Sequence, residues 1–332
     1  MAASLAAGFP RNQALAASSL RVTHFGGPYA VLEEIIGGAY KAAGFGDVEY
    51  EQDQPSLILA KWQAQRNDPP YDIGLLERPH TIRAGASGLA LPLTATELPN
   101  LTNALPGAVA DQGAGVALAF DTIDIMYDKT AVATPITSWL DLWRPDLAGK
   151  IMLPGMPIDG AIVYMLVACA RASGISEPDV EKILPKFVEL KQNVRSFYSD
   201  PNQATQLLER GEIVAAVQYS ARIGQLMKRD SRFTRATPKE GVPAIPYDLV
   251  GASGSKNPDG VKKYINLAAS AEIQQKVCSS ILLNPSMKGV TLTDDIRALI
   301  IADENKLFAV NDVAVVERQQ AWLERWQREV QS

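Results

Sequence analysis

The stretch LRVTHFGGPYAVLEEIIGGAY, residues 20–40, contains a strand pattern, a glycine-rich turn and a helix pattern in direct succession. Leu20–His24 alternates apolar and polar residues, which predicts a strand, and the apolar residues of Leu32–Tyr40 recur at helical spacing. The glycines and proline at 26–28 predict the turn between them. A strand followed at once by a helix is typical of a parallel sheet that is covered by helices.

The alternation continues along the chain and then starts again. Strand Val48–Glu51, helix Leu57–Gln65 and strand Asp72–Leu76 complete a βαβαβ unit. Two adjoining strand patterns follow around Ala117–Lys129. The second series of predicted elements is Lys150–Leu153, Gly160–Ala172, Asp179–Lys191, Val194–Tyr198, Asn202–Arg210 and Ile213–Val217. A third block, the extended run Ala244–Ala252, comes before the predicted helices Pro258–Ala268 and Ala271–Ser280. Two such series predict an α/β protein of two lobes, each a doubly wound, mainly parallel sheet, joined by hinge strands.

Several crossings between the lobes are expected, so the lobes are interleaved in sequence. We predict residues 17–122 plus 249–286 for lobe 1, and 123–248 plus 287–332 for lobe 2 with a C-terminal helix. A chain of 332 residues with 47% hydrophobic and 21% charged residues is longer than one core usually organises. The net charge of −5 argues against a nucleic-acid partner. No uninterrupted run of about 18 apolar residues occurs, so no membrane-spanning helix is predicted.

The N-terminus contains small apolar residues, and Ala14-Leu15-Ala16 fits a cleavage site. Residues 1–16 are therefore interpreted as the remainder of an export signal, which predicts a periplasmic protein. The alternative is a disordered N-terminal tail with no targeting role. The chain has two cysteines, Cys169 and Cys278. Two cysteines are too few for a metal cage, so we expect two small buried apolar residues, with a 169–278 disulfide as the alternative.

The segment SWLDLWRPDLAGKI, Ser138–Ile151, resembles the polyamine- and iron-type extracellular solute-binding proteins. The other stretches that agree in order and spacing are Pro70–Gly74, Gly88–Leu93, Ile125–Lys129, Pro238–Gly241 and Ser255–Gly260. As a set they cover nearly the whole chain. The resemblance implies the type II periplasmic-binding-protein fold and a monomeric receptor of an ABC importer. Such a receptor binds a small solute between its lobes and delivers it to a membrane permease, with no cofactor, metal or chemical reaction.

Ligands of open α/β sheets bind beyond the carboxyl ends of the strands, so the loops there supply the candidate contacts. After the first strand, Gly26 and Gly27 allow backbone N–H groups to approach a ligand beside Tyr29. After the third, Glu77 and Arg78 suit a ligand that carries ammonium and carboxylate groups. The alternative for this pair is two surface charges of little effect.

The crossing between the lobes contains Phe120 and Thr122 as candidate contacts, where an aromatic ring either walls the pocket or belongs to the core. In lobe 2, Asp159, Gly160 and Ala161 begin a helix whose bare N–H groups would donate hydrogen bonds to an anionic oxygen.

Two further loops of lobe 2 complete the candidate site. Tyr219 and Arg222 follow a strand, although a surface position is an alternative for the arginine. Tyr247 and Asp248 lie where polyamine receptors carry a tryptophan and, two residues later, an aspartate. Here the corresponding positions are Ile245 and Tyr247, and the aspartate is displaced by one residue, which turns its side chain to the other face.

The broken polyamine pattern and the available arginine favour a small carboxylate-bearing or zwitterionic solute. A polyamine remains the first alternative. A ferric-ion receptor is a second, although none of the ten tyrosines is next to another. An enzyme on the same fold is the third, although no phosphate loop, nucleophile elbow or His-Glu-x-x-His motif occurs.

Overall fold

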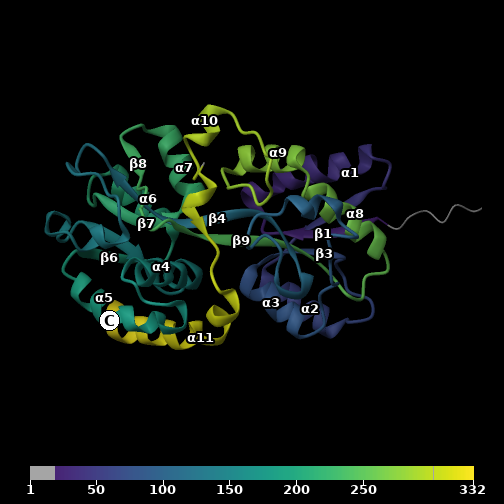
Figure 1. The fold of residues 1–332 in the computed structure, drawn as a ribbon, viewed down its shortest axis with the longest axis horizontal. Helices are drawn as coiled ribbons and strands as arrows, with labels where there is room; N and C mark the ends of the chain where they lie inside the picture. The colour runs from purple at the N-terminus through teal and green to yellow at the C-terminus, as the bar shows by residue number, and fades with distance from the viewer. Residues whose placement is uncertain (1–18, 302) are drawn as a thin grey trace, which may run out of the picture.

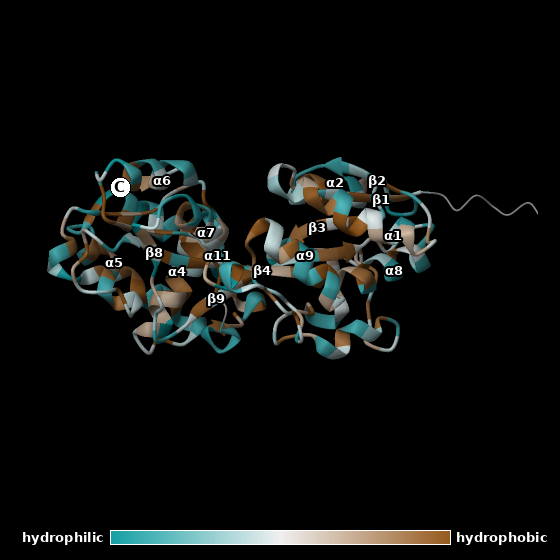
Figure 2. Cartoon of the chain, turned by 90° about the horizontal axis from the view of Figure 1, so that it is seen from above, coloured by the Kyte–Doolittle hydropathy of each residue, from teal (hydrophilic) through white to brown (hydrophobic). Residues whose placement is uncertain are grey.

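A computed structural model describes residues 19–301 and 303–332 of the chain. These residues form two α/β lobes side by side, joined by the long strands β4 (Val116–Asp128) and β9 (Val242–Gly251), as Figures 1 and 2 show. The predicted two-lobed fold is confirmed. The expected export-signal segment, residues 1–16, lies outside the described residues.

The first lobe is built on three parallel strands, with β1 between β2 and β3, and β9 adds an antiparallel strand beside β3. Ile73, Leu75 and Leu76 of β3 are fully buried, as expected of a parallel strand that is covered on both faces. The elements of this lobe are β1 Leu20–His24, β2 Val48–Gln52, β3 Ile73–Glu77, α1 Gly38–Ala42, α2 Pro55–Ala64, α3 Arg78–Ala86, α8 Pro258–Ala268 and α9 Ala271–Ile281.

The second lobe repeats this plan, with β5 lying parallel between β6 and β7, and with β4 antiparallel to β7. Residues 161–170 of α4 are all buried, because lobe 2 encloses this apolar helix on every side. Its elements are β5 Ile151–Pro154, β6 Val194–Tyr198, β7 Ala215–Tyr219, β8 Phe233–Arg235, β10 Leu307–Phe308, α4 Asp159–Ala172, α5 Leu184–Leu190, α6 Pro201–Glu209, α7 Ser220–Arg229 and α11 Asp312–Arg325. The remaining short helix, α10 (Asp294–Arg297), packs with the lobe 1 core through Ile296.

The hinge is formed where β4 changes its partner. Up to Thr122, β4 pairs with β9, and from Ile123 onward it pairs with β7, so one strand belongs to both sheets. The sequence predicted two adjoining strands at this place, but β4 is a single strand of 13 residues. Since every residue of β4 is buried, no exposed turn position interrupts it.

The segment Ser138–Ile151 is helical at Trp139–Trp143, turns at Pro145 and leads into β5 at Ile151. It forms two short 3-10 helices, Trp139–Trp143 and Pro145–Leu147, because Ser138 caps the first and Pro145 cannot continue it. The C-terminal helix α11 packs on α4 and also contacts α3 of the other lobe. Within the described ranges, no helix is long and apolar enough to cross a membrane.

The two cysteines lie in different lobes. Cys169 is buried in the core of lobe 2 and Cys278 in the core of lobe 1, and both are free thiols. The expectation of two small buried apolar residues is confirmed, and the alternative of a 169–278 disulfide is wrong because the lobes hold the two thiols apart.

Candidate functional site

A cavity of about 460 Å³ lies between the lobes, at the hinge. Its walls are the first turn of α3 in lobe 1, the first turn of α4 in lobe 2 and one face of α11, and part of β9 lines it as well. Strands β3 and β7 end at this cavity, because the carboxyl ends of parallel strands meet at one edge of each sheet. The predicted residues that line the cavity are Glu77, Asp159, Gly160, Tyr219 and Tyr247.

Aromatic rings gather behind Tyr247, which lines the cavity, and this part of the wall is called its aromatic end. The ring of Tyr247 packs edge-on against Phe25 and Tyr29, with centroid distances of 5.6 and 5.8 Å, and Phe25 and Tyr29 are 5.1 Å apart. A Cβ atom on Gly160 would lie 3.2 Å from the Tyr219 hydroxyl, so the small residue that opens α4 leaves this hydroxyl room. The ring edges and hydroxyls of this cluster suit a ligand that is partly apolar and partly polar.

The charge of the cavity is negative. Its ionisable walls are Glu77, Asp159 and Glu324 against the single guanidinium of Arg83. Burial in the cleft raises the pKa of Glu77, and repulsion by Asp159 raises it further, against the opposing effect of Arg83. Burial also raises the pKa of Asp159. Burial and, secondly, Arg83 lower the pKa of His80 to about 4, so this ring is neutral at pH 7 and adds no positive charge.

Arg78 and Asp248 do not point into the cavity. Nε of Arg78 lies 2.7 Å from Oδ2 of Asp248, and Nη2 lies 2.8 Å from Oδ1, in a two-pronged ion pair that is buried at both ends. The expected role of Arg78 in binding a ligand carboxylate is therefore wrong for this arrangement, because Asp248 occupies its guanidinium. The alternation along β9 turns Tyr247 to the cavity and Asp248 away from it.

Most of the other predicted contacts also lie outside the cavity. The N–H of Gly26 donates to Nδ1 of His24 (2.9 Å), and the neighbouring Gly27 is exposed. Tyr29 reaches the cavity only through its contact with Tyr247. Ala161 is buried in the lobe 2 core.

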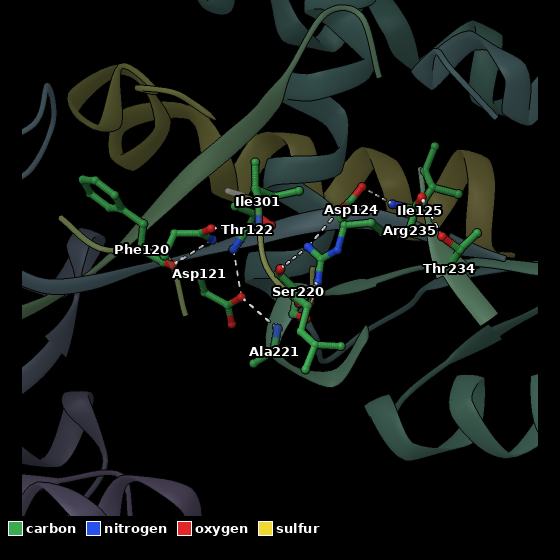
Figure 3. A network of polar contacts seen from close by, with 12 residues as sticks. Phe120, Asp121, Thr122, Asp124, Ile125, Ser220, Ala221, Thr234, Arg235 and Ile301 are labelled. Carbon is green, nitrogen blue, oxygen red and sulfur yellow. Dashed lines mark hydrogen bonds and ion pairs between the residues drawn. The ribbon is translucent and has the colours of Figure 1, made fainter. Parts of the chain in front are cut away.

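Phe120 and Thr122 lie on the face of β4 opposite to Asp121, and Phe120 packs in the lobe 1 core (Figure 3). Arg222 projects from the first turn of α7, where Nη1 donates to Oδ1 of Asn202 at 2.7 Å. These positions correct the expectation that the three side chains contact a ligand directly.

Sequence reasoning missed three groups. Arg83 lies one helical turn beyond Pro79 on α3, and the i+4 spacing places it on the cavity side. Asp121 lies between the predicted contacts Phe120 and Thr122. Because side chains alternate along a strand, the opposite face of these two residues was the signal for Asp121. One face of α11 lines the cavity, and its residues there are Val315, Gln319, Gln320, Leu323 and Glu324, with Gln327 just after the helix. This helix lies across both lobes, and the local sequence contains no signal for that.

Two α/β lobes on shared hinge strands, with a cavity of polar and apolar side chains between them, define a receptor that encloses a small solute. The family model described as bacterial extracellular solute-binding protein matches residues 39–304, so the chain belongs to that family. Its role is therefore that of a solute-binding protein.

The chain is similar to two curated receptors and to solved structures. It is 25% identical to the gamma-aminobutyric acid-binding protein of Pseudomonas aeruginosa over 283 residues, which are 82% of this chain and 78% of that protein. It is 24% identical to spermidine/putrescine-binding periplasmic protein 1 of Haemophilus influenzae over 271 residues, 76% and 71% of the two chains. A crystal structure of an ABC transporter from Clostridium perfringens superposes with a TM-score of 0.83 at 24% identity, covering 94% of this chain and 100% of that one.

Proposed function

We propose that this receptor binds a small zwitterionic solute with a primary ammonium group, and that it delivers the solute to a membrane permease from the periplasm. The observation that carries the proposal is the excess of acid in the cavity. Glu77 belongs to lobe 1 and Asp159 to lobe 2, and the pKa of Glu77 is raised partly by the charge of Asp159. An ammonium group between the two carboxylates would relieve this repulsion.

The other end of a zwitterion requires a positive group, and two features of the cavity supply it. Arg83 is exposed in the cavity wall, and its Nε donates one hydrogen bond, to the carbonyl of Pro79 at 3.3 Å. Most of its N–H groups therefore remain available to a solute carboxylate. The first turn of α4, at Gly160, adds bare N–H groups and the positive end of the helix. A monomer suffices for this site, since one chain provides both lobes.

The names of the relatives support the same class of solute. The two curated relatives are a gamma-aminobutyric acid receptor and a polyamine receptor, and both of these solutes carry a primary ammonium group. A polyamine is the second candidate. The cavity wall favours it because three carboxylates and only one guanidinium line the cavity. Within residues 19–301 and 303–332, no three His, Cys, Asp or Glu side chains gather into a possible metal site.

Isothermal titration of the purified chain tests the proposal with three probes of similar length. We expect 4-aminobutanoate to bind more tightly than putrescine, and butyrate, which lacks the ammonium group, to bind weakly. The variant Glu77→Gln should lower the affinity for 4-aminobutanoate about 10- to 100-fold, the range for a hydrogen bond to a charged group.

The control is Glu272→Gln, since Glu272 lies on the surface of α9 and pairs only with Lys276. It should bind as the wild type does. Tighter binding of putrescine would replace the zwitterion by a polyamine. Binding of butyrate alone, or of none of the three probes, would refute an ammonium solute.

A further inference from the structure

Asp121 is a buried acid directly behind the aromatic end of the cavity. It lies on β4 next to the residue where this strand passes from the sheet of lobe 1 to that of lobe 2, and it is 3% exposed. Its Oδ1 accepts the N–H of Thr122 at 2.8 Å and the N–H of Ala221 at 3.4 Å, as Figure 3 shows. Its Oδ2 accepts the hydroxyl of Tyr247 at 3.4 Å.

The carboxylate of Asp121 makes no direct contact with a cationic side chain among the described residues, although the charge of Arg235 acts on it from a distance. Within the described ranges, no lysine, arginine or histidine forms an ion pair with it, and Arg235 is directed to Asp124 and Ser220 instead. Asp124 is just as buried, but its Oδ2 lies 3.4 Å from Nη1 of Arg235. Figure 3 shows the two acids on opposite faces of β4, with Asp121 turned away from the guanidinium. An unpaired buried carboxylate costs stability, so its presence indicates a function.

Asp121 and Glu77 act on the same three tyrosines. Burial is the main cause that raises the pKa of Tyr29, Tyr219 and Tyr247, and in each case the charges of both Asp121 and Glu77 add to it. The three hydroxyls therefore lie in a negative potential with one acid on the cavity wall and the other behind the rings. Such a place favours a cation, because both carboxylates attract positive charge.

We propose that Asp121 is a positioning residue that selects for a primary ammonium group at the aromatic end of the cavity. It acts through Tyr247. An ionised carboxylate only accepts hydrogen bonds, so the Tyr247 hydroxyl donates a hydrogen bond to Asp121. The oxygen of the Tyr247 hydroxyl can then accept a hydrogen bond from the solute. The negative charge of Asp121 is then balanced by the positive charge of the bound ammonium group. This inference rests on the proposed function, since it assigns one group to that solute.

The pH dependence of binding follows from the surroundings of Asp121. Burial raises the pKa of Asp121 to about 6, while the N–H groups of Thr122 and Ala221 and the charge of Arg235 oppose the rise. The other ionisable groups that face it are tyrosines of raised pKa, which stay neutral below pH 9. Protonation removes the negative charge, so the affinity for an ammonium probe should fall as the pH is lowered through about 6.

The test compares Asp121→Asn with Asp124→Asn, which removes an equally buried acid of the same strand. Titrations use 4-aminobutanoate, putrescine and butyrate between pH 5 and pH 8. For Asp121→Asn we expect a loss of about 10- to 100-fold for both ammonium probes at pH 8, little change for butyrate, and a flatter pH profile. Asp124→Asn should keep the wild-type affinities and the wild-type profile. Circular dichroism verifies that each variant is folded, and Tyr247→Phe, which removes only the hydroxyl, replaces Asp121→Asn if that variant does not fold.

Three results would overturn the inference. Unchanged affinity in Asp121→Asn, while Glu77→Gln binds more weakly, would remove Asp121 from recognition and leave the proposed function intact. A weaker affinity with an unchanged pH profile would reduce Asp121 to a structural role. If the wild type binds neither ammonium probe, the proposed function fails first and the inference fails with it.

Discussion

Replacing Asp312 by asparagine should stabilise the protein at alkaline pH, whereas replacing Asp248 by asparagine should destabilise it, although both acids approach the same guanidinium. Asp248 accepts two hydrogen bonds from Arg78, at 2.7 and 2.8 Å, while Oδ2 of Asp312 lies 3.6 Å from Nη1 of Arg78. Asp312 also accepts the Tyr164 hydroxyl at 3.3 Å, a bond that an asparagine oxygen can keep. One guanidinium thus faces two buried carboxylates, and only the first is fully paired.

The magnitude follows from the pKa of Asp312. Burial raises it to about 7, because the attraction of Arg78 is outweighed at this distance and Asp248 adds repulsion. In the unfolded chain an aspartate titrates near about 4. The folded chain therefore binds more protons between these values, and the contribution of Asp312 to the free energy of unfolding falls as the pH rises from about 4 to about 7. Between pH 5 and pH 8 this loss amounts to about 2–3 kcal/mol.

Urea unfolding at pH 5 and pH 8, without solute, measures both effects. The free energy of unfolding of Asp312→Asn should be higher than that of the wild type. This difference between variant and wild type should be about 2–3 kcal/mol larger at pH 8 than at pH 5. Asp248→Asn should lose about 3 kcal/mol, since it strips the buried guanidinium of its better partner. A destabilised Asp312→Asn at pH 8, or a difference from the wild type that does not change with pH, would refute this account of the three groups.

Three further outcomes follow from local structure. Burial raises the pKa of the Cys169 and Cys278 thiols, so a thiol reagent should label neither in the native protein and both in urea. Asp200 caps α6 through the N–H of Asn202 at 2.9 Å, and Asp200→Ala should lower the free energy of unfolding by about 1 kcal/mol. Gly113 has a φ of 70°, and a Cβ there would collide with the carbonyl oxygen of Leu93, so Gly113→Ala should cost more than about 1 kcal/mol by the same measurement.

Regular alternation made most of the fold predictable. Leu20–His24, Val194–Tyr198 and Pro258–Ala268 have in the structure the bounds that periodicity indicates, because each lies between clear turn residues. Periodicity failed at β4, where burial on both faces removes the alternation that would mark one continuous strand.

The candidate site was predictable where its residues follow a strand. Glu77 and Tyr219 were found in this way, since the end of a strand can be read locally, whereas Tyr247 lies inside β9 and was found through the family resemblance. The pairing of Arg78 with Asp248 was not, because it joins residues 170 positions apart and depends on how β9 lies beside α3. A charged residue at a strand end looks the same in the sequence whether it faces a solute or a buried acid.

The position of Glu77 and Asp159 on different lobes has a consequence for closure of the receptor. Closing the lobes brings like charges together, so the empty receptor should favour the open state, and a solute cation should remove the repulsion. A solute shifts the two states only by its difference in affinity for them. Glu77→Gln removes the repulsion without a solute, and we expect its radius of gyration in small-angle scattering to be smaller than that of the empty wild type. An unchanged radius would mean that the hinge strands, rather than these two charges, hold the empty receptor open.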